Sequence, residues 1–126
     1  MIDVKDLRIG NVVDGGDYVN NPSTIIKIDE ERAIAKSQSA IEFTSINGIE
    51  LSRINLSSYR FTEPFIIDDF YFQERNVDGG SIRLKKIENN QYEVYLKNND
   101  ISFKLRNINW LHELQNIFYF TFGIEL

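Results

Sequence analysis

Basic and aromatic side chains alternate along three neighbouring segments in the second half of the chain. They are Arg83 and Lys85, then Tyr95, then Lys104 and Arg106. If these segments pair as antiparallel strands, the five side chains share one face of a sheet. Sheets that combine cations with stacking rings bind single-stranded nucleic acids in several protein modules. This face is therefore the candidate binding surface of the sequence.

The overall charge opposes the use of this face for nucleic acids. The chain has 14 basic and 19 acidic residues, which gives a formal net charge of −5. Acidic residues outnumber basic ones in residues 1–63 and again in residues 64–126. A negative protein repels phosphate groups at long range. We therefore expect no binding to nucleic acids at physiological salt.

The side chains needed for catalysis or metal binding are scarce. Cysteine is absent, which excludes disulfides, thiolate nucleophiles and cysteine-ligated metals. The single histidine, His112, is next to Glu113 in a predicted helix, and such neighbours point in different directions. We therefore predict that His112 bridges the helix to the N-terminal part of the chain, in a structural role.

The acidic residues also lack the spacing of a functional site. Asp14, Asp17 and Asp78 flank pairs of glycines, which indicates turns rather than metal ligands. The glycine-rich phosphate-binding motifs and the Gly-x-Ser-x-Gly motif are missing. We predict no catalytic, cofactor or metal site, and a protein that is not an enzyme.

The apolar segments are too short for a membrane. The first residues lack the basic start and apolar run of a signal peptide, and the longest apolar runs have only a few residues. A membrane-spanning helix needs about 20. We expect a cytoplasmic protein that does not associate with membranes.

The first half of the chain predicts a small β-rich lobe. Residues 6–13 indicate a turn that leads into a strand, and further strands are predicted at 23–28, 32–37 and 40–45. This series of short strands favours an SH3-like barrel. A short helix is predicted at 53–59, and Pro64 then marks the expected boundary between a domain of residues 1–62 and one of residues 63–126.

The second half predicts an antiparallel meander and a helix. Strands are expected at 69–75, 81–87, 92–96 and 101–106, because apolar and polar residues alternate there between tight turns. Apolar residues at helical spacing predict a helix over 110–122 that covers the apolar face of the four-stranded sheet. The fold class is therefore predicted to be α+β.

The apolar stripe of this last helix is wider than one sheet face requires. Tyr119, Phe120 and Phe122 extend it around the helix. An exposed aromatic patch usually marks an interface. We expect either a monomer in which the helix also contacts the N-terminal lobe, or a homodimer.

Motifs at both ends of the chain resemble a known family. Residues 6–13 (DLRIGNVV), 48–52 (GIELS), 112–119 (HELQNIFY) and 123–126 (GIEL) are similar to segments of small uncharacterised proteins of Bacteroidetes-type bacteria and their phages and prophages. The sequence departs from that family at residues 120–122, which alters the packing expected of the last helical turn. The resemblance implies a phage-associated lineage and carries no activity with it.

These observations favour a non-enzymatic interaction or assembly module with an unknown protein partner. The first alternative is a module that binds single-stranded nucleic acid with the basic sheet face. The second is an acidic mimic that occupies a basic site on a host protein and inhibits it.

Overall fold

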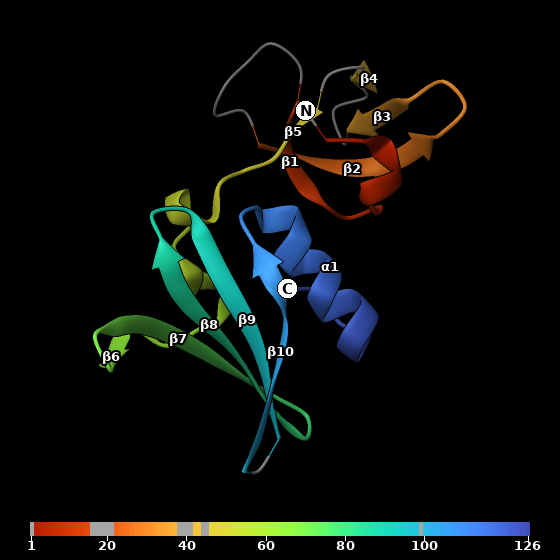
Figure 1. Cartoon of the computed structure of the whole chain (residues 1–126). Coiled ribbons are helices and arrows are strands. Elements are labelled where there is room, and N and C mark those ends of the chain that lie inside the picture. Colours follow the sequence, from red (N-terminus) through yellow and green to blue (C-terminus); the bar gives the residue numbers. More distant parts are fainter. Residues whose placement is uncertain (1, 16–21, 38–41, 44–45, 99) are drawn as a thin grey trace. The chain divides into compact units, whose positions relative to one another are not determined.

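The computed structural model describes residues 2–15, 22–37, 42–43, 46–98 and 100–126 (Figure 1). These residues form two antiparallel sheets and a C-terminal α-helix, so the predicted α+β class is confirmed. The chain divides into two compact units. We call residues 1–49 with 110–126 the terminal unit, and residues 50–109 the meander unit. The domain boundary expected between residues 62 and 63 does not coincide with this division.

The sheet of the terminal unit is antiparallel and has the strand order β4-β3-β2-β1-β5. A 3-10 turn, η1 (Val4–Asp6), precedes the strands, which are β1 (Val12–Gly15), β2 (Pro22–Asp29), β3 (Ile34–Ser37), β4 (Glu42–Phe43) and β5 (Ile46–Asn47). Residues 46–47, for which the sequence predicts no strand, pair with β1 as β5. The apolar core of this unit consists of buried side chains from the turn and the strands: Val4, Leu7, Val13, Ile25, Ala35 and Ile46.

The meander unit contains the four strands that the sequence predicts and one more. The strands are β6 (Phe65–Ile67), β7 (Phe70–Val77), β8 (Gly80–Glu88), β9 (Gln91–Asn98) and β10 (Ile101–Ile108), in the sheet order β10-β9-β8-β7-β6. The additional strand, β6, has three residues and turns into β7 through Asp68 and Asp69. Both aspartates have positive φ, 51° and 70°, as a two-residue hairpin turn requires.

The helix predicted at residues 53–59 is wrong. The segment forms two 3-10 turns instead, η2 (Leu51–Arg53) and η3 (Leu56–Tyr59). The side chain of Asn55 accepts a hydrogen bond from the Ser57 backbone N–H at 3.2 Å, so a new turn begins where a helix would have continued. Arg60 ends this turn with φ of 69°.

The α-helix α1 (Leu111–Phe122) closely matches the predicted range. At its start, the Glu113 carboxylate accepts the backbone N–H of Trp110 at 3.2 Å. At its end, Gly123 adopts φ of 68° and donates its N–H to the Tyr119 carbonyl at 2.8 Å. The helix belongs to the terminal unit. The sequence instead predicts that this helix covers the four-stranded sheet of the meander.

Asn11, Gln115 and Asn116 join α1 to the chain that leads into β1, and we call them the Asn11 network. Asn11 Nδ2 donates to Asn116 Oδ1 at 2.9 Å, and Asn116 Nδ2 donates to the Asp6 carbonyl at 3.1 Å. The Gln115 side-chain oxygen accepts the Val12 backbone N–H at 2.9 Å. Asn11 has no exposed surface. A buried amide costs free energy unless it is paired, so these bonds fix the helix in place.

A second contact between the same segments is centred on Arg8. Its guanidinium donates to both carboxylate oxygens of Glu125, at 2.8 and 2.9 Å, and lies 4.1 Å from the centre of the Tyr119 ring. The Arg8 backbone N–H donates to Asn11 Oδ1 at 2.6 Å. Residues 6–13, 112–119 and 123–126 therefore meet at one place in the terminal unit.

The chain leaves the terminal unit after Ile49 and returns to it at Trp110. Within the terminal unit, Leu111 N–H donates to the Ile49 carbonyl at 2.8 Å. Within the meander unit, Leu51 N–H donates to the Asn109 carbonyl at 3.0 Å. Each unit thus holds the two crossing segments of the chain against each other by a backbone hydrogen bond.

Replacing Asn11 with alanine tests the Asn11 network. The change removes the hydrogen bond that Asn11 donates to Asn116 of α1 and the one that it accepts from the Arg8 backbone N–H. We expect Asn11→Ala to lower the free energy of unfolding by about 1–3 kcal/mol, measured by urea denaturation. Asn76→Ala, at an exposed asparagine of β7, is the matched control and should change stability by no more than about 0.5 kcal/mol. Equal stability of the two variants would contradict the anchoring role of Asn11.

Candidate interaction surface

Four of the five predicted surface residues lie on one face of the meander, which we call the charged face. In the register of the strands, Arg83 of β8 lies opposite Tyr95 of β9, and Tyr95 lies opposite Lys104 of β10. Lys85 follows Arg83 two residues later on β8 and lies opposite Glu93. The sequence therefore correctly places these four side chains together.

The fifth predicted residue, Arg106, does not join them. A bulge between Lys104 and Arg106 shifts the register, so that Arg106 lies opposite Val94. Val94 is fully buried and belongs to the other face of the sheet from its neighbour Tyr95. An extra residue in a strand reverses the alternation beyond it, which is why a strict period of two misplaces Arg106.

Glu74 pairs with one of the cations of the charged face. Its carboxylate accepts two hydrogen bonds from the Arg83 guanidinium, at 2.8 and 3.2 Å, and one from the Ser81 hydroxyl at 2.6 Å. Burial by itself raises the pKa of the Glu74 carboxyl. The hydrogen bonds from Ser81 and Arg83, with the positive charges nearby, outweigh it and leave this pKa below its ordinary value.

Glu93 pairs with the remaining cations. It accepts a hydrogen bond from Tyr95 Oη at 3.0 Å and forms ion pairs with Lys104 at 2.9 Å and with Lys85 at 3.8 Å. The hydrogen bond from Lys104 lowers the pKa of Glu93 despite partial burial. Burial and the bond to Glu93 raise the pKa of Tyr95. The predicted basic face is thus neutralised by carboxylates within the same sheet.

Phenylalanines also lie on the charged face. Phe72 lies opposite Lys85, so Phe70 and Phe72 project from the same face as the cations and not from the face of the buried apolar side chains of β8. The rings of Phe65 and Phe72 stack with centroids 6.0 Å apart. Lys85 Nζ lies 4.0 Å from the Phe70 ring centre. These contacts cover the cations with aromatic surface and further reduce their attraction for a phosphate.

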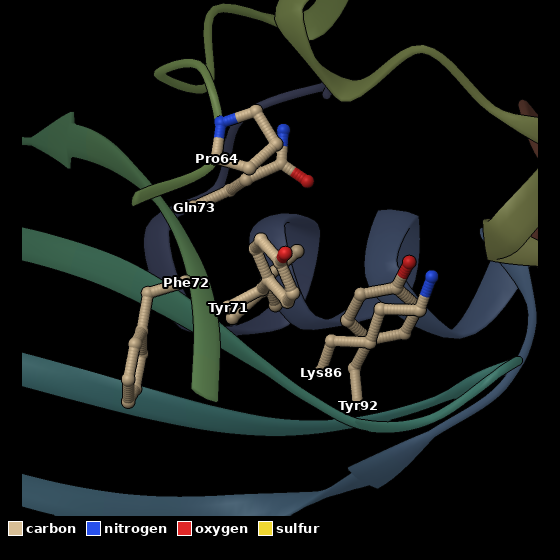
Figure 2. Close-up of a pocket in the computed structure, with 7 residues that line it drawn as sticks. Pro64, Tyr71, Phe72, Gln73, Lys86 and Tyr92 are labelled. Atoms are coloured by element: carbon tan, nitrogen blue, oxygen red, sulfur yellow. The ribbon is translucent and has the colours of Figure 1, made fainter. Parts of the chain in front are cut away.

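A small pocket opens within the meander unit (Figure 2). The side chains of Tyr71, Lys86 and Tyr92 lie on three neighbouring strands opposite one another. The side chain of Phe72 points away from them. The remaining lining residues are Pro64, Gln73 and Leu84. Burial raises the pKa of the Tyr92 hydroxyl. The cavity volume is about 230 Å³, which is below the ~300–1,000 Å³ typical of a small-molecule site. We therefore do not assign a small-molecule ligand to it.

The strand β10 exposes a row of three large apolar side chains at an edge of the sheet. The exposed fractions are 58% for Ile101, 56% for Phe103 and 39% for Leu105. The sequence predicts that these residues lie under a covering helix, but α1 belongs to the terminal unit and not to the meander unit. The order of the strands in the sheet decides which strand lies at an edge. The alternation of apolar and polar residues within one strand does not reveal that order. This row of side chains is the feature that sequence reasoning missed.

The other edge of the sheet is different. It is formed by β6, which has three residues and directly follows Pro64. Short edge strands and proline are common means by which proteins prevent edge-to-edge association. The eight-residue β10 carries such protection only in its cations and its bulge. The two edges therefore differ in their capacity to pair with another strand.

The remaining candidates for chemistry are His112 and the acidic side chains in the part of the chain that the structure describes. In the described ranges, no group of His, Asp and Glu side chains is arranged to hold a metal ion. His112 is buried in α1, in the terminal unit. No helix among the described residues combines the length and the apolar character needed to cross a membrane.

Comparison with known proteins adds no assignment. No family model, curated protein or solved structure matches the chain. The interpretation of the surface therefore depends on its geometry and chemistry.

The charged face makes stability dependent on pH. The pKa values of Glu74 and Glu93 are lower in the folded protein than their ordinary values, so folding favours the ionised carboxylates. Their contribution is complete above the unfolded-state pKa and is lost as the pH falls through the folded-state pKa. We expect the urea midpoint to decrease between neutral pH and about pH 3.

Glu93→Gln should flatten this decrease, because glutamine does not titrate. Glu88→Gln, at an exposed carboxylate at the end of β8, is the matched control and should keep the wild-type slope. An identical slope for Glu93→Gln and the wild type would show that Glu93 makes no ionisation-dependent contribution.

Proposed function

We propose that the protein is a non-enzymatic interaction module that binds a protein partner along β10. The observation that carries this proposal is the exposure of Ile101, Phe103 and Leu105 on one long edge strand. An edge strand presents unpaired backbone N–H and C=O groups, and an extended partner strand completes them while its side chains cover the apolar ones. The partner is therefore recognised through main-chain hydrogen bonds and apolar contacts.

The resemblance to a phage-associated lineage is consistent with an assembly role in the cytoplasm, where the partner would be a phage or bacterial protein. We further propose that the terminal unit closes as an SH3-like barrel. The pairing of β1 with both β2 and β5, around one buried apolar cluster, supports this closure. In this proposal the terminal unit is a scaffold, and the meander edge is the contact surface.

Single-stranded nucleic acid is the alternative ligand, and the row formed by Arg83, Tyr95 and Lys104 favours it. Glu74 and Glu93 oppose it, because they already occupy the cations that would bind phosphates. An acidic mimic is less well supported, since these two carboxylates face cations of the same chain and not a partner.

Replacing Phe103 with lysine tests the proposed edge contact. We expect the immobilised wild-type protein to retain at least one protein from a lysate of its native host, and Phe103→Lys to retain about tenfold less of it, because a charge replaces the central apolar contact. Ile66→Lys is the matched control, at an exposed apolar residue of the opposite edge strand, and should behave as wild type. Equal retention by all three proteins would rule out β10 as the contact.

Oligonucleotide titration separates the alternative function. At physiological salt we expect no measurable binding of mixed DNA or RNA oligonucleotides to the wild type, and weak binding to the double variant Glu74→Gln with Glu93→Gln, which releases the cations. Micromolar binding by the wild type that Arg83→Gln with Lys104→Gln abolishes would support the alternative instead. In that case Tyr95→Ala should cost roughly 1–3 kcal/mol through lost stacking.

A further inference from the structure

We infer that the pocket of the meander unit binds the carboxylate of an acidic side chain of a protein partner, through Lys86. Tyr71, Lys86 and Tyr92 line this pocket and come from β7, β8 and β9 (Figure 2). Its volume of about 230 Å³ is small for a small-molecule ligand but suits a single side chain that anchors a protein partner. The pocket does not include β10, so this inference goes beyond the proposed function and does not depend on it.

Lys86 projects from the face of the sheet opposite to the charged face. It follows the buried Leu84 by two residues on β8, so both side chains project from the same face. Lys86 lies opposite Tyr71 on one neighbouring strand and opposite Tyr92 on the other. The lysine therefore stands at the end of a buried apolar row, with a tyrosine on each side.

Lys86 differs from the cations of the charged face because it has no acidic partner. The cations described on that face form ion pairs with Glu74 or Glu93. Within the described ranges, Lys86 forms no side-chain hydrogen bond or ion pair, and no residue that lines the pocket is acidic. A half-buried ammonium group is stabilised by an anion beside it. The charge of the pocket is therefore complementary to a carboxylate.

Two hydroxyl groups lie close to this charge. In Figure 2 the oxygens of Tyr71 and Tyr92 and the nitrogen of Lys86 all point away from the strands, in the same direction. Neither hydroxyl has a hydrogen-bond partner among the described residues. Burial raises the pKa of Tyr92, so its hydroxyl keeps its proton at neutral pH and can donate it to a carboxylate in a hydrogen bond.

The chain before β6 fixes the rim of the pocket. Gln73 Nε2 donates to the Thr62 carbonyl at 3.1 Å, and the Thr62 N–H donates to the Glu74 carbonyl at 2.8 Å. Pro64 follows two residues later and lines the pocket together with Leu84. Their apolar surface suits the methylene groups of a glutamate side chain, while the ammonium and hydroxyl groups suit its carboxylate. Because the rim is already held in place, little ordering is required on binding.

Nuclear magnetic resonance titration of the isotope-labelled protein with capped tripeptides tests this site. We expect acetyl-Ala-Glu-Ala-amide to shift the backbone amide signals of Tyr71, Lys86 and Tyr92, with a dissociation constant on the order of 1 mM. The peptide with glutamine in place of glutamate should bind at least about tenfold more weakly, because it lacks the charge. Equal binding of the two peptides, or shifts confined to other residues, would overturn the inference. Tighter binding of inorganic phosphate than of the glutamate peptide would also overturn it, since the occupant would then not be an acidic side chain.

Three variants locate the interaction. Lys86→Met removes the charge and keeps the apolar stem, so it should weaken binding of the glutamate peptide at least about tenfold. Lys97→Met, at a cation opposite Ser81 near the other end of β9, is the matched control and should bind as wild type. Tyr92→Phe removes only a hydroxyl and should weaken binding several-fold, which provides a test even if Lys86→Met does not fold. Wild-type affinity in Lys86→Met, or in Tyr92→Phe when Lys86→Met does not fold, would contradict the inference.

Discussion

The terminal unit depends on the need of one buried side chain for hydrogen-bond partners. Asn11 is completely inaccessible, and an amide in that position must be paired. Its partner Asn116 lies more than a hundred residues later in the chain, on α1. The Gln115 side chain adds a bond to the backbone of β1, and Arg8 adds its contacts with Glu125 and Tyr119. The helix is positioned by these polar bonds as well as by its apolar residues.

The same need of polar groups for partners explains why the charged face of the meander has so little capacity to bind an anion. Its charged face carries cations that could attract a phosphate, but Arg83, Lys85 and Lys104 are each matched by a carboxylate or an aromatic ring on a neighbouring strand. Cross-strand pairs of this kind stabilise a sheet and consume its binding capacity at once. The unmatched surface is apolar and lies at the edge, where strand order and not side-chain choice leaves β10 without a neighbour in the described sheet.

The meander strands could be predicted from the sequence because their signals are local. Alternation, together with turns such as the one at Asp78 and Gly79, locates β7 to β10 within a few residues. The strand β6 was missed because three residues carry no measurable period. The bulge that displaces Arg106 and the pairing of Arg83 with Glu74 were missed for a different reason. Both depend on the register between strands, which alternation within one strand does not determine.

The position of α1 could not be predicted from local sequence patterns either. The apolar stripe of α1 predicts that one side of the helix is buried. It does not identify the element that buries it. The decisive residues are polar, namely Gln115 and Asn116, and their partners lie near the start of the chain. Amide side chains in the middle of a helix are commonly interpreted as solvent-exposed, so the buried Gln115 and the half-buried Asn116 beside an apolar face are the signal that could have located the contact.

The meander unit lies between the two parts of the terminal unit, and this order has a consequence for biosynthesis. On the ribosome, residues 1–49 are made before the meander unit and α1 is made after it. At about 5–20 residues per second, the 60 residues from 50 to 109 take roughly 3–12 seconds to make. During that interval the nascent chain holds Asn11 without its partners on α1. A chaperone that recognises incompletely folded chains would therefore have its opportunity at the amino-terminal end, although that end is synthesised first.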